Sequence, residues 1–436
     1  MYLVERQSNT LDQLFSAEAV RERCYQLGKL AEVNQTKWFS YHPSELAACI
    51  RRVVNTCLKN YPDLDIPLHS RWRHFVVCDQ LNIANKTNLW EYYTTGSLGN
   101  RFIDDNIARA KTAMDLTFVS VLLDAGAGAS WSYHDPITEQ RLVRSEGLAA
   151  ASIDFFFNYL AKFDSTKGWV VDAQALQSLS LSRLAKAFQV SETNPLVGLP
   201  DRLRLLKGLG QVLSENEALS RPGDLYDECL SLARSHPGNQ NMGESEKECQ
   251  PHVVIDAAQL LKLVLTRFSA IWPNGYQHKG VNLGDCGYHS SVLGEAGTNG
   301  IVAFHKLSQW LSYSLVEPLK WGGVVVSELD GLTGLPEYRN GGLLLDSNVL
   351  QLKDKRLLNQ PLAVTSEAVV EWRALTVYLL DKLAEGVRRE FGKTRQELPL
   401  CAILQGGTWA AGRILAMEKR GDGSPPLSLA INGTIF

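Results

Sequence analysis

The sequence lacks an excess of either charge and lacks any long apolar run. It carries 44 Lys and Arg residues against 47 Asp and Glu residues, a formal charge of -3. Proteins that bind nucleic acid or anionic membranes usually show a basic excess, and a membrane-spanning helix needs about 20 apolar residues. The first residues also lack the basic start and apolar run of a signal peptide. We therefore expect a cytoplasmic protein that binds neither nucleic acid nor membrane.

Paired cysteines and standard catalytic motifs are absent as well. The eight cysteines are scattered, and no two have the C-x-x-C spacing. This pattern is typical of reduced thiols in an intracellular protein rather than of disulfides or structural zinc. The sequence has no HExxH, GxSxG or P-loop motif. We expect neither a metal nor a cofactor.

What is present is a long chain with helical patterning. Hydrophobic residues make up 45% and charged residues 21% of its 436 residues, so a sizeable core can form. Apolar residues recur at helical spacing over most of the chain, and strand patterns are few. We expect a mainly α protein with one large helical domain and a few short strands.

Turn-rich and polar segments predict how the chain is divided into parts. Residues 1–66 are predicted to be a helical segment packed on the core, and residues 67–436 a helical domain of catalytic type. Residues near 216–250 are polar and rich in Gly, Pro, Ser and Glu, which indicates a mobile surface insertion. The sequence leaves the oligomeric state open.

The densest stretch of candidate site residues runs over 301–345. An amphipathic helix there carries Lys306 and Gln309 on one flank, and we expect Pro318 to end it. A glycine-rich loop follows, of the kind that often holds a small polar molecule. Its polar residues are Asp330, Glu337, Tyr338 and Arg339.

A second cluster is HSRWRHF, residues 69–75, with Arg71, Trp72, Arg73 and His74. An extended segment would place both arginines on one face, where they could bind a phosphate or carboxylate through bidentate hydrogen bonds. The alternative is a surface pair beside a buried tryptophan. Both interpretations stay open.

Two further places carry candidate charges. Asp124 ends a helix and is followed by Gly126, Gly128 and Trp131, which indicates a close-approach loop; its G-x-G is weak support for phosphate binding, because no Rossmann pattern surrounds it.

On a long helix that Ser366 is expected to cap, Glu371 and Arg373 flank the apolar stripe. Charges placed in this way are either paired structurally or directed into a cleft. Carboxylates with cations and aromatics, and no metal motif, suit the handling of a sugar or sugar phosphate, in particular glycosidic cleavage.

Seven blocks of the sequence resemble the uracil-catabolism protein 4 family of fungi and bacteria. They are VSVLLDAGAG (119–128), RSEGLA (144–149), AFQVSETNPLVGL (187–199), FHKLSQWLSYSLVEPL (304–319), ELDGLTGLPEYRNGGL (328–343), VVEWRALTVYLLD (369–381) and GGTWAAGR (406–413). The resemblance covers most of the chain from about Pro67 onward. It implies a role in the pathway that opens the pyrimidine ring of uracil, in which ribosylurea-type intermediates occur.

The order of blocks is also distantly similar to the queuosine-salvage nucleotide glycosylases, which are all-α with a DNA-glycosylase-like core. FHKLSQ matches their block at Lys306 and Gln309, and VVEWRA matches their glutamate-containing helix at Glu371 and Arg373. PEYR would place a functional carboxylate at Glu337, beside Tyr338 and Arg339. The resemblances also imply a carboxylate where this chain has Gln405.

The leading hypothesis is an N-ribosyl hydrolase that cleaves a ribosylurea-type nucleoside or its 5′-phosphate. The catalytic candidates are Glu337, which would stabilise an oxocarbenium-like centre or activate water, and Asp330, which with Glu371 would orient ribose hydroxyls. The substrate-binding candidates are Lys306, Gln309, Tyr338, Arg339, Glu371, Arg373, Arg71, Trp72, Arg73, His74, Asp124 and Trp131. The alternatives are a non-catalytic protein that binds a nucleotide or a partner, and an amidohydrolase-type step on a ureido acid.

Overall fold

The computed structural model describes residues 11–78, 86–95, 105–128, 130–235, 253–272, 275–295 and 297–430. Helices dominate these residues, and the strands are two to four residues long and occur as two-stranded pairs. The expected mainly α fold with a few short strands is confirmed.

The α-helices run through the whole described chain. They are α2 (Ala17–Glu32), α3 (Pro43–Asn60), α4 (Leu89–Thr94), α5 (Asn106–Leu122), α6 (Arg144–Phe155), α7 (Ala173–Gln177), α8 (Leu181–Ala187), α9 (Leu199–Glu215), α10 (Leu225–Arg234), α11 (Ala257–Phe268), α12 (Lys306–Trp321), α13 (Tyr338–Asp346), α14 (Glu367–Phe391), α15 (Leu400–Ile403) and α16 (Trp409–Arg420). Short 3-10 helices are η1 (Arg71–Phe75), η3 (Pro222–Asp224), η6 (Ser269–Ile271), η7 (Leu329–Gly331) and η8 (Lys355–Asn359). Two π-helical turns, η2 (Phe156–Leu160) and η9 (Leu404–Thr408), complete the set.

The strands tie loops together rather than build a sheet. The antiparallel pairs are β1 (Phe39–Tyr41) with β14 (Leu350–Leu352), β2 (Val76–Cys78) with β3 (Lys86–Asn88), β4 (Ser132–His134) with β5 (Arg141–Val143), β6 (Lys162–Asp164) with β7 (Gly168–Val170), β9 (Gln277–His278) with β10 (Val281–Asn282), and β11 (Cys286–Tyr288) with β12 (Ile301–Ala303). The parallel pairs are β8 (Val253–Asp256) with β13 (Val324–Ser327) and β15 (Leu362–Ala363) with β16 (Leu429–Ala430).

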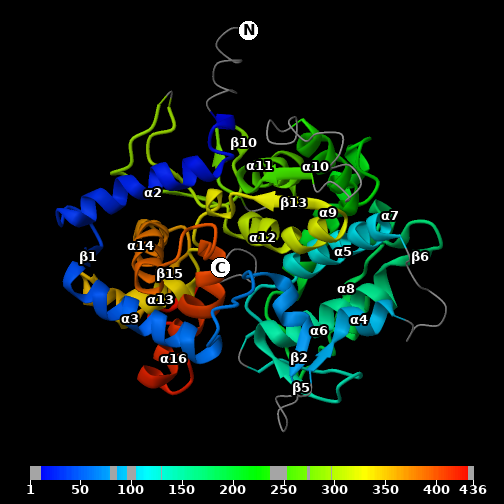
Figure 1. Ribbon diagram of the computed structural model, residues 1–436, viewed down its shortest axis with the longest axis horizontal. Helices are drawn as coiled ribbons and strands as arrows, with labels where there is room; N and C mark the ends of the chain where they lie inside the picture. The colour runs from blue at the N-terminus through cyan, green and yellow to red at the C-terminus, as the bar shows by residue number, and fades with distance from the viewer. Residues whose placement is uncertain are drawn as a thin grey trace.

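The first described helices pack against the last ones. In Figure 1 the blue helices α2 and α3 lie against the orange and red helices α14 and α16, and contacts join these elements. The ring of Tyr378 on α14 lies across Gly28 of α2, where a Cβ would meet ring atoms at 2.3 Å. Glycine at this position therefore lets the two helices approach closely. The proposed boundary at residue 66 stays a prediction.

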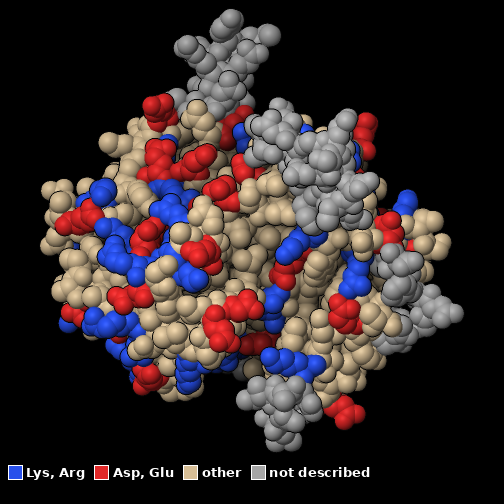
Figure 2. All heavy atoms as spheres, viewed as in Figure 1, with Lys and Arg blue, Asp and Glu red and all other residues tan. Residues whose placement is uncertain are grey.

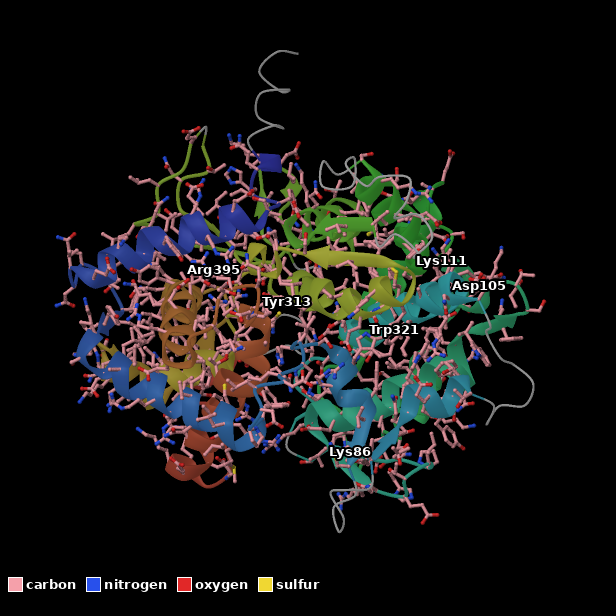
Figure 3. The ribbon with its side chains drawn as sticks, viewed as in Figure 1. Lys86, Asp105, Lys111, Tyr313, Trp321 and Arg395 are labelled. Carbon is pink, nitrogen blue, oxygen red and sulfur yellow. The ribbon has the colours of Figure 1, made fainter. Side chains whose placement is uncertain are left out.

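Helices α5 and α12 pack together at the centre of the molecule. Phe118 of α5 and Leu315 of α12 are fully buried in one large apolar cluster. Tyr313 of α12 is buried in the interior (Figure 3), and its hydroxyl donates to the carbonyl oxygen of Thr333 at 3.1 Å. This bond ties the central helix to the loop that precedes Glu337.

The expectation that Pro318 ends its helix is wrong, because α12 continues to Trp321. A proline inside a helix cannot bond the carbonyl four residues earlier, which here belongs to Ser314. That carbonyl instead accepts the indole N–H of Trp72 at 2.9 Å. A side chain from η1 thus replaces the missing backbone bond, and the helix passes through the proline.

The region of the expected insertion is described in part. Residues 222–234 form η3 and α10, while residues 236–252 lie outside the described part of the chain, so the insertion stays a prediction. None of the described helices is both long and apolar enough to cross a membrane. On the face shown in Figure 2, Lys and Arg side chains are interspersed with Asp and Glu, as the near-neutral composition implies.

Candidate functional site

A cavity of about 610 Å³ brings together seven of the predicted site residues. Its walls come from η1, the loop after α5, the starts of α6, α12 and α13, and α16 with the loop that follows it. The predicted residues that line it are His74, Asp124, Trp131, Lys306, Glu337, Tyr338 and Arg339. Segments separated by hundreds of residues therefore meet in one hollow of a size that suits a small ligand.

Glu337 lies at the N-cap of α13 and lines the cavity. Its two carboxylate oxygens accept the backbone N–H groups of Arg339 and Asn340, each at 2.6 Å. Burial raises the pKa of Glu337, while these hydrogen bonds and the charges of Lys306 and Arg339 oppose the rise. The result is a carboxylate with a fixed orientation, set at the positive end of a helix.

Lys306 is the first residue of α12, and its backbone N–H donates to Asp285 Oδ2 at 2.9 Å. The residue before it, His305, adopts φ 48°, an uncommon conformation for a residue with a side chain. Burial lowers the pKa of Lys306, and the charge of Glu337 opposes that shift. An ammonium group and a carboxylate therefore act on one another across the cavity wall.

Asp124 follows the end of α5 and forms an ion pair with Arg71, which lies outside the cavity. The guanidinium group of Arg71 is fully buried, with Nη1 3.0 Å from Asp124 Oδ2 and Nε donating to Ser120 at 2.7 Å. Burial lowers the pKa of Arg71, and the charge of Asp124 opposes this. Arg71 thus positions Asp124 in the cavity wall and does not itself line the cavity.

The loop after Asp124 is held by a second buried arginine, Arg202. Its guanidinium group donates to the carbonyl oxygens of Leu123, Ala125 and Gly126 at 3.1, 2.8 and 3.1 Å. Burial lowers the pKa of Arg202 to about 10. The close-approach loop expected from the glycines is therefore fixed by a side chain that the sequence analysis did not single out.

One side of the cavity is aromatic. His69 packs on Trp310 with ring centroids 4.6 Å apart, and His74 lies edge-on to Trp310 and Trp409 at 6.4 and 6.3 Å. Burial lowers the pKa of His69 to about 4 and also lowers the pKa of His74. Both imidazoles are therefore neutral near pH 7, and the wall offers flat, uncharged faces.

Two of the predicted acids do not line the cavity. Asp330 in η7 binds Arg388 Nη2 at 2.5 Å and accepts the backbone N–H of Leu400 at 2.7 Å. Glu371 in α14 is fully buried, and its carboxylate accepts the backbone N–H groups of Lys37, Trp38 and Phe39 at 2.8 to 2.9 Å and lies 2.9 Å from His289 Nε2. Both carboxylates hold distant segments together.

Gln309 and Arg373 also bind other parts of the protein. Gln309 exchanges hydrogen bonds of 2.7 Å with Thr333. Arg373 forms a bidentate pair with Asp285 at 2.8 and 2.7 Å and stacks over Phe304. Asp285 also accepts the N–H of Lys306, so Arg373 supports the start of α12 from outside the cavity.

The HSRWRHF segment is a 3-10 helix, η1, rather than an extended segment, and its arginines do not share a ligand. Arg73 pairs with Glu317, and Arg71 pairs with Asp124. Trp72 is buried against Trp90 and Trp321. Only His74 among the four predicted residues of this segment lines the cavity.

The cavity also contains residues outside the predicted set. Those with polar or aromatic side chains include His69, Arg144, Trp310, Trp409, Arg413 and Asp422. Arg144, Trp409 and Arg413 lie within the RSEGLA and GGTWAAGR blocks, so those motifs could have marked them. Nothing in the sequence shows that Asp422 returns to the start of α6.

Among the described residues, no group of three His, Cys, Asp or Glu side chains could hold a metal ion. The cavity instead offers carboxylates, cations and aromatic faces, a set that suits a polar organic ligand with a flat group.

The comparisons with known proteins agree along nearly the whole chain. A family model described as "Protein of unknown function (DUF1688)" matches residues 13–436. "Protein urg3" of Schizosaccharomyces pombe is 35% identical over 98% of this chain and 100% of that protein. "Uracil catabolism protein 4" of Lachancea kluyveri is 33% identical over 98% of this chain and 99% of that protein.

These matches confirm the resemblance to the uracil-catabolism protein 4 family, whereas the resemblance to the queuosine-salvage glycosylases stays a prediction. The chain belongs to the DUF1688 family.

Proposed function

We propose that the protein acts in uracil catabolism as an N-ribosyl hydrolase, cleaving a ribosylurea-type nucleoside or its 5′-phosphate. The name of the Lachancea kluyveri relative supports the pathway. The observation that carries the activity is the position of Glu337, whose carboxylate is fixed in orientation on the wall of the cavity, together with the ammonium group of Lys306.

In the proposed reaction the C1′–N bond of the substrate breaks and a C1′–O bond to water forms. Glu337 stabilises the positive charge that develops at C1′ and accepts a proton from the attacking water, and it then gives that proton to the leaving nitrogen, which restores the carboxylate. A carboxylate whose pKa is raised by burial is a better base than an exposed one.

Asp124 and the aromatic wall lie on the same cavity. We place the ureido leaving group there, because a planar ureido group can stack on indole and imidazole faces while its N–H groups donate to a carboxylate. The buried arginine behind Asp124 holds that carboxylate in place through a 3.0 Å ion pair.

A second candidate is a non-catalytic protein that binds a nucleotide of the same pathway. The amide oxygen of Gln405 lies 2.8 Å from Nδ1 of His69 on the cavity wall, where the family resemblance implies a carboxylate. An amide can neither accept a proton from water nor stabilise a cation as a carboxylate does. This substitution favours binding without turnover.

One panel of substrates separates these functions. The protein is incubated with synthetic ribosylurea, ribosylurea 5′-phosphate and a ureido acid, and pentose, urea and ammonia are measured. The hydrolase proposal predicts one pentose from ribosylurea, or one pentose 5-phosphate from its 5′-phosphate, for each urea released. Ammonia from the ureido acid would instead indicate an amidohydrolase, and ligand-dependent thermal stabilisation without any product would indicate the binding protein.

A further inference from the structure

Two arginines that are far apart in the sequence are held by neighbouring residues of one loop on the cavity wall. Arg144 donates to the carbonyl oxygen of Asp422 at 3.1 Å, and Arg339 donates to the carbonyl oxygen of the next residue, Gly423, at 2.8 Å. Both arginines line the cavity. Adjacent backbone carbonyl groups of one loop therefore hold both arginines.

A third arginine joins this patch through α6. Arg413 Nη1 lies 3.2 Å from Glu146, which is two residues after Arg144, and both partners are 41% exposed. Arg413 also lines the cavity. Half-exposed ion pairs are weak, so an incoming anion can share Arg413 with little loss.

The start of α6 adds backbone donors to the patch. Val143, Arg144 and Ser145 line the cavity, and Val143 is the N-cap of this 12-residue helix, without a side-chain cap. The first N–H groups of a helix have no partner within the helix and attract anions. Arg144 itself adopts φ 56°, which is uncommon for a residue with a side chain.

An independent observation comes from Arg339. Its side chain is 5% exposed, and its Nε atom is buried without a hydrogen-bond partner among the described residues. Buried guanidinium donors are normally paired, because leaving one unpaired is costly. This donor belongs to a residue of the cavity wall, where an anion could bind it.

The balance of charge in the cavity favours an anion. Among its described lining residues, the cations are Lys306, Arg144, Arg339 and Arg413, and the acids are Asp124, Glu337 and Asp422. Asp124 is already paired with Arg71 from outside the cavity. Asp422 accepts the backbone N–H of Ser424 at 2.8 Å, and its carbonyl oxygen accepts a hydrogen bond from Arg144, so its carboxylate is a group that an anion must avoid.

We infer that Arg144, Arg339, Arg413 and the start of α6 form a subsite for the phosphate group of a phosphorylated pentose. Guanidinium groups match phosphate oxygens through paired hydrogen bonds. The substrate of the proposed reaction is then the 5′-phosphate rather than the free nucleoside. The pentose in this inference rests on the proposed function, whereas the anion subsite does not.

Isothermal titration calorimetry with ribose 5-phosphate, ribose and inorganic phosphate tests the inference without turnover. We expect ribose 5-phosphate to bind at least about 100-fold more tightly than ribose, and Arg144→Gln and Arg413→Gln each to weaken it about 10- to 100-fold. Arg144 is exposed and the Arg413 side chain is 41% exposed, and a thermal melt of each variant checks the fold.

The matched control is Arg395→Gln, which removes an exposed arginine paired with Glu385 (Figure 3) and does not line the cavity. It should leave the affinity for ribose 5-phosphate unchanged. Equal affinity for ribose and ribose 5-phosphate, or equal losses in all three variants, would overturn the subsite. Binding of inorganic phosphate as tightly as ribose 5-phosphate would overturn the pentose as its ligand.

Turnover separates this inference from the proposed function. If ribosylurea and its 5′-phosphate are hydrolysed with equal kcat/KM, the hydrolase stands and the phosphate subsite fails. If ribose 5-phosphate binds through the arginines and neither ribosylurea is hydrolysed, the subsite stands and the hydrolase fails.

Discussion

Nδ1 of His69 lies 2.8 Å from Oε1 of Gln405, so a residue of the cavity wall is held by an amide from the π-helical turn η9. The amide brings no charge to this contact, and burial dominates, lowering the pKa of His69 to about 4. The imidazole is therefore neutral near pH 7, and its Nδ1 carries the proton if it donates to Gln405.

Replacing that amide with an acid should change the charge of the cavity. In Gln405→Glu the carboxylate would favour the imidazolium form, so the pKa of His69 should rise from about 4 towards or above its ordinary value of 6.5. NMR titration of the His69 ring protons measures it. An unchanged pKa would mean that the contact does not set the charge of His69.

Acid should destabilise the protein through the same residue. Because the pKa of His69 is depressed from 6.5 to about 4, its contribution to stability is complete above pH 6.5 and is lost as the pH falls towards 4. The depression corresponds to about 3 kcal/mol at most.

Urea unfolding at pH 7.5 and pH 4.5 checks this prediction. The wild type should lose more free energy of unfolding between these pH values than His69→Asn does. An equal loss in the two proteins would assign acid sensitivity to other groups, such as His74 and His305, whose pKa values are also lowered by burial.

Glu371 should matter for stability and not for ligand binding, although the sequence placed it among the substrate residues. In the wild type, three backbone N–H groups and His289 share the two carboxylate oxygens of Glu371. Glu371→Gln replaces one of these oxygens with an N–H₂ group, which cannot accept their hydrogen bonds. Each buried donor left without its acceptor costs about 1 to 3 kcal/mol.

Thermal unfolding should therefore show a marked fall in Tm for Glu371→Gln, with the affinity for ribose 5-phosphate preserved in the folded fraction. A normal Tm with lost affinity would return Glu371 to the site.

The contact between Trp72 and α12 gives a third stability prediction. Trp72→Phe keeps an aromatic ring but leaves the Ser314 carbonyl without the donor that Pro318 cannot supply. A buried carbonyl without a partner costs about 1 to 3 kcal/mol. Urea unfolding should detect this loss, and a variant as stable as the wild type would contradict the role assigned to the indole N–H.

Local patterns predicted much of the fold. Apolar residues at helical spacing predicted the helices that dominate the described residues. Ser366 lies at the N-cap of α14 as expected, although its hydroxyl makes no capping hydrogen bond there. Pro318 misled the prediction because its effect depends on Trp72, which is 246 positions away in the sequence and contacts Ser314 only in the folded chain.

The candidate site was predicted in part for the same reason. Asp124 was predicted at a helix end, Lys306 on a helix flank and Glu337 in a glycine-rich loop, and the three meet in the cavity at helix ends. Glu371 and Asp330 are also carboxylates close to other candidate site residues in the sequence. Each of them nevertheless accepts a backbone N–H group from another segment. Periodicity shows which side of a helix is buried and does not show which partner it meets.

The central claim is that Glu337 performs the chemistry, and the rate of urea release from ribosylurea 5′-phosphate by Glu337→Gln tests it most directly. The matched control is Asp105→Asn, which makes the same change of carboxylate to amide at the N-cap of α5 (Figure 3), at a residue that does not line the cavity. The account predicts a fall of about 100- to 10,000-fold in kcat for Glu337→Gln and a normal rate for the control. Equal rates in Glu337→Gln and the wild type would contradict it.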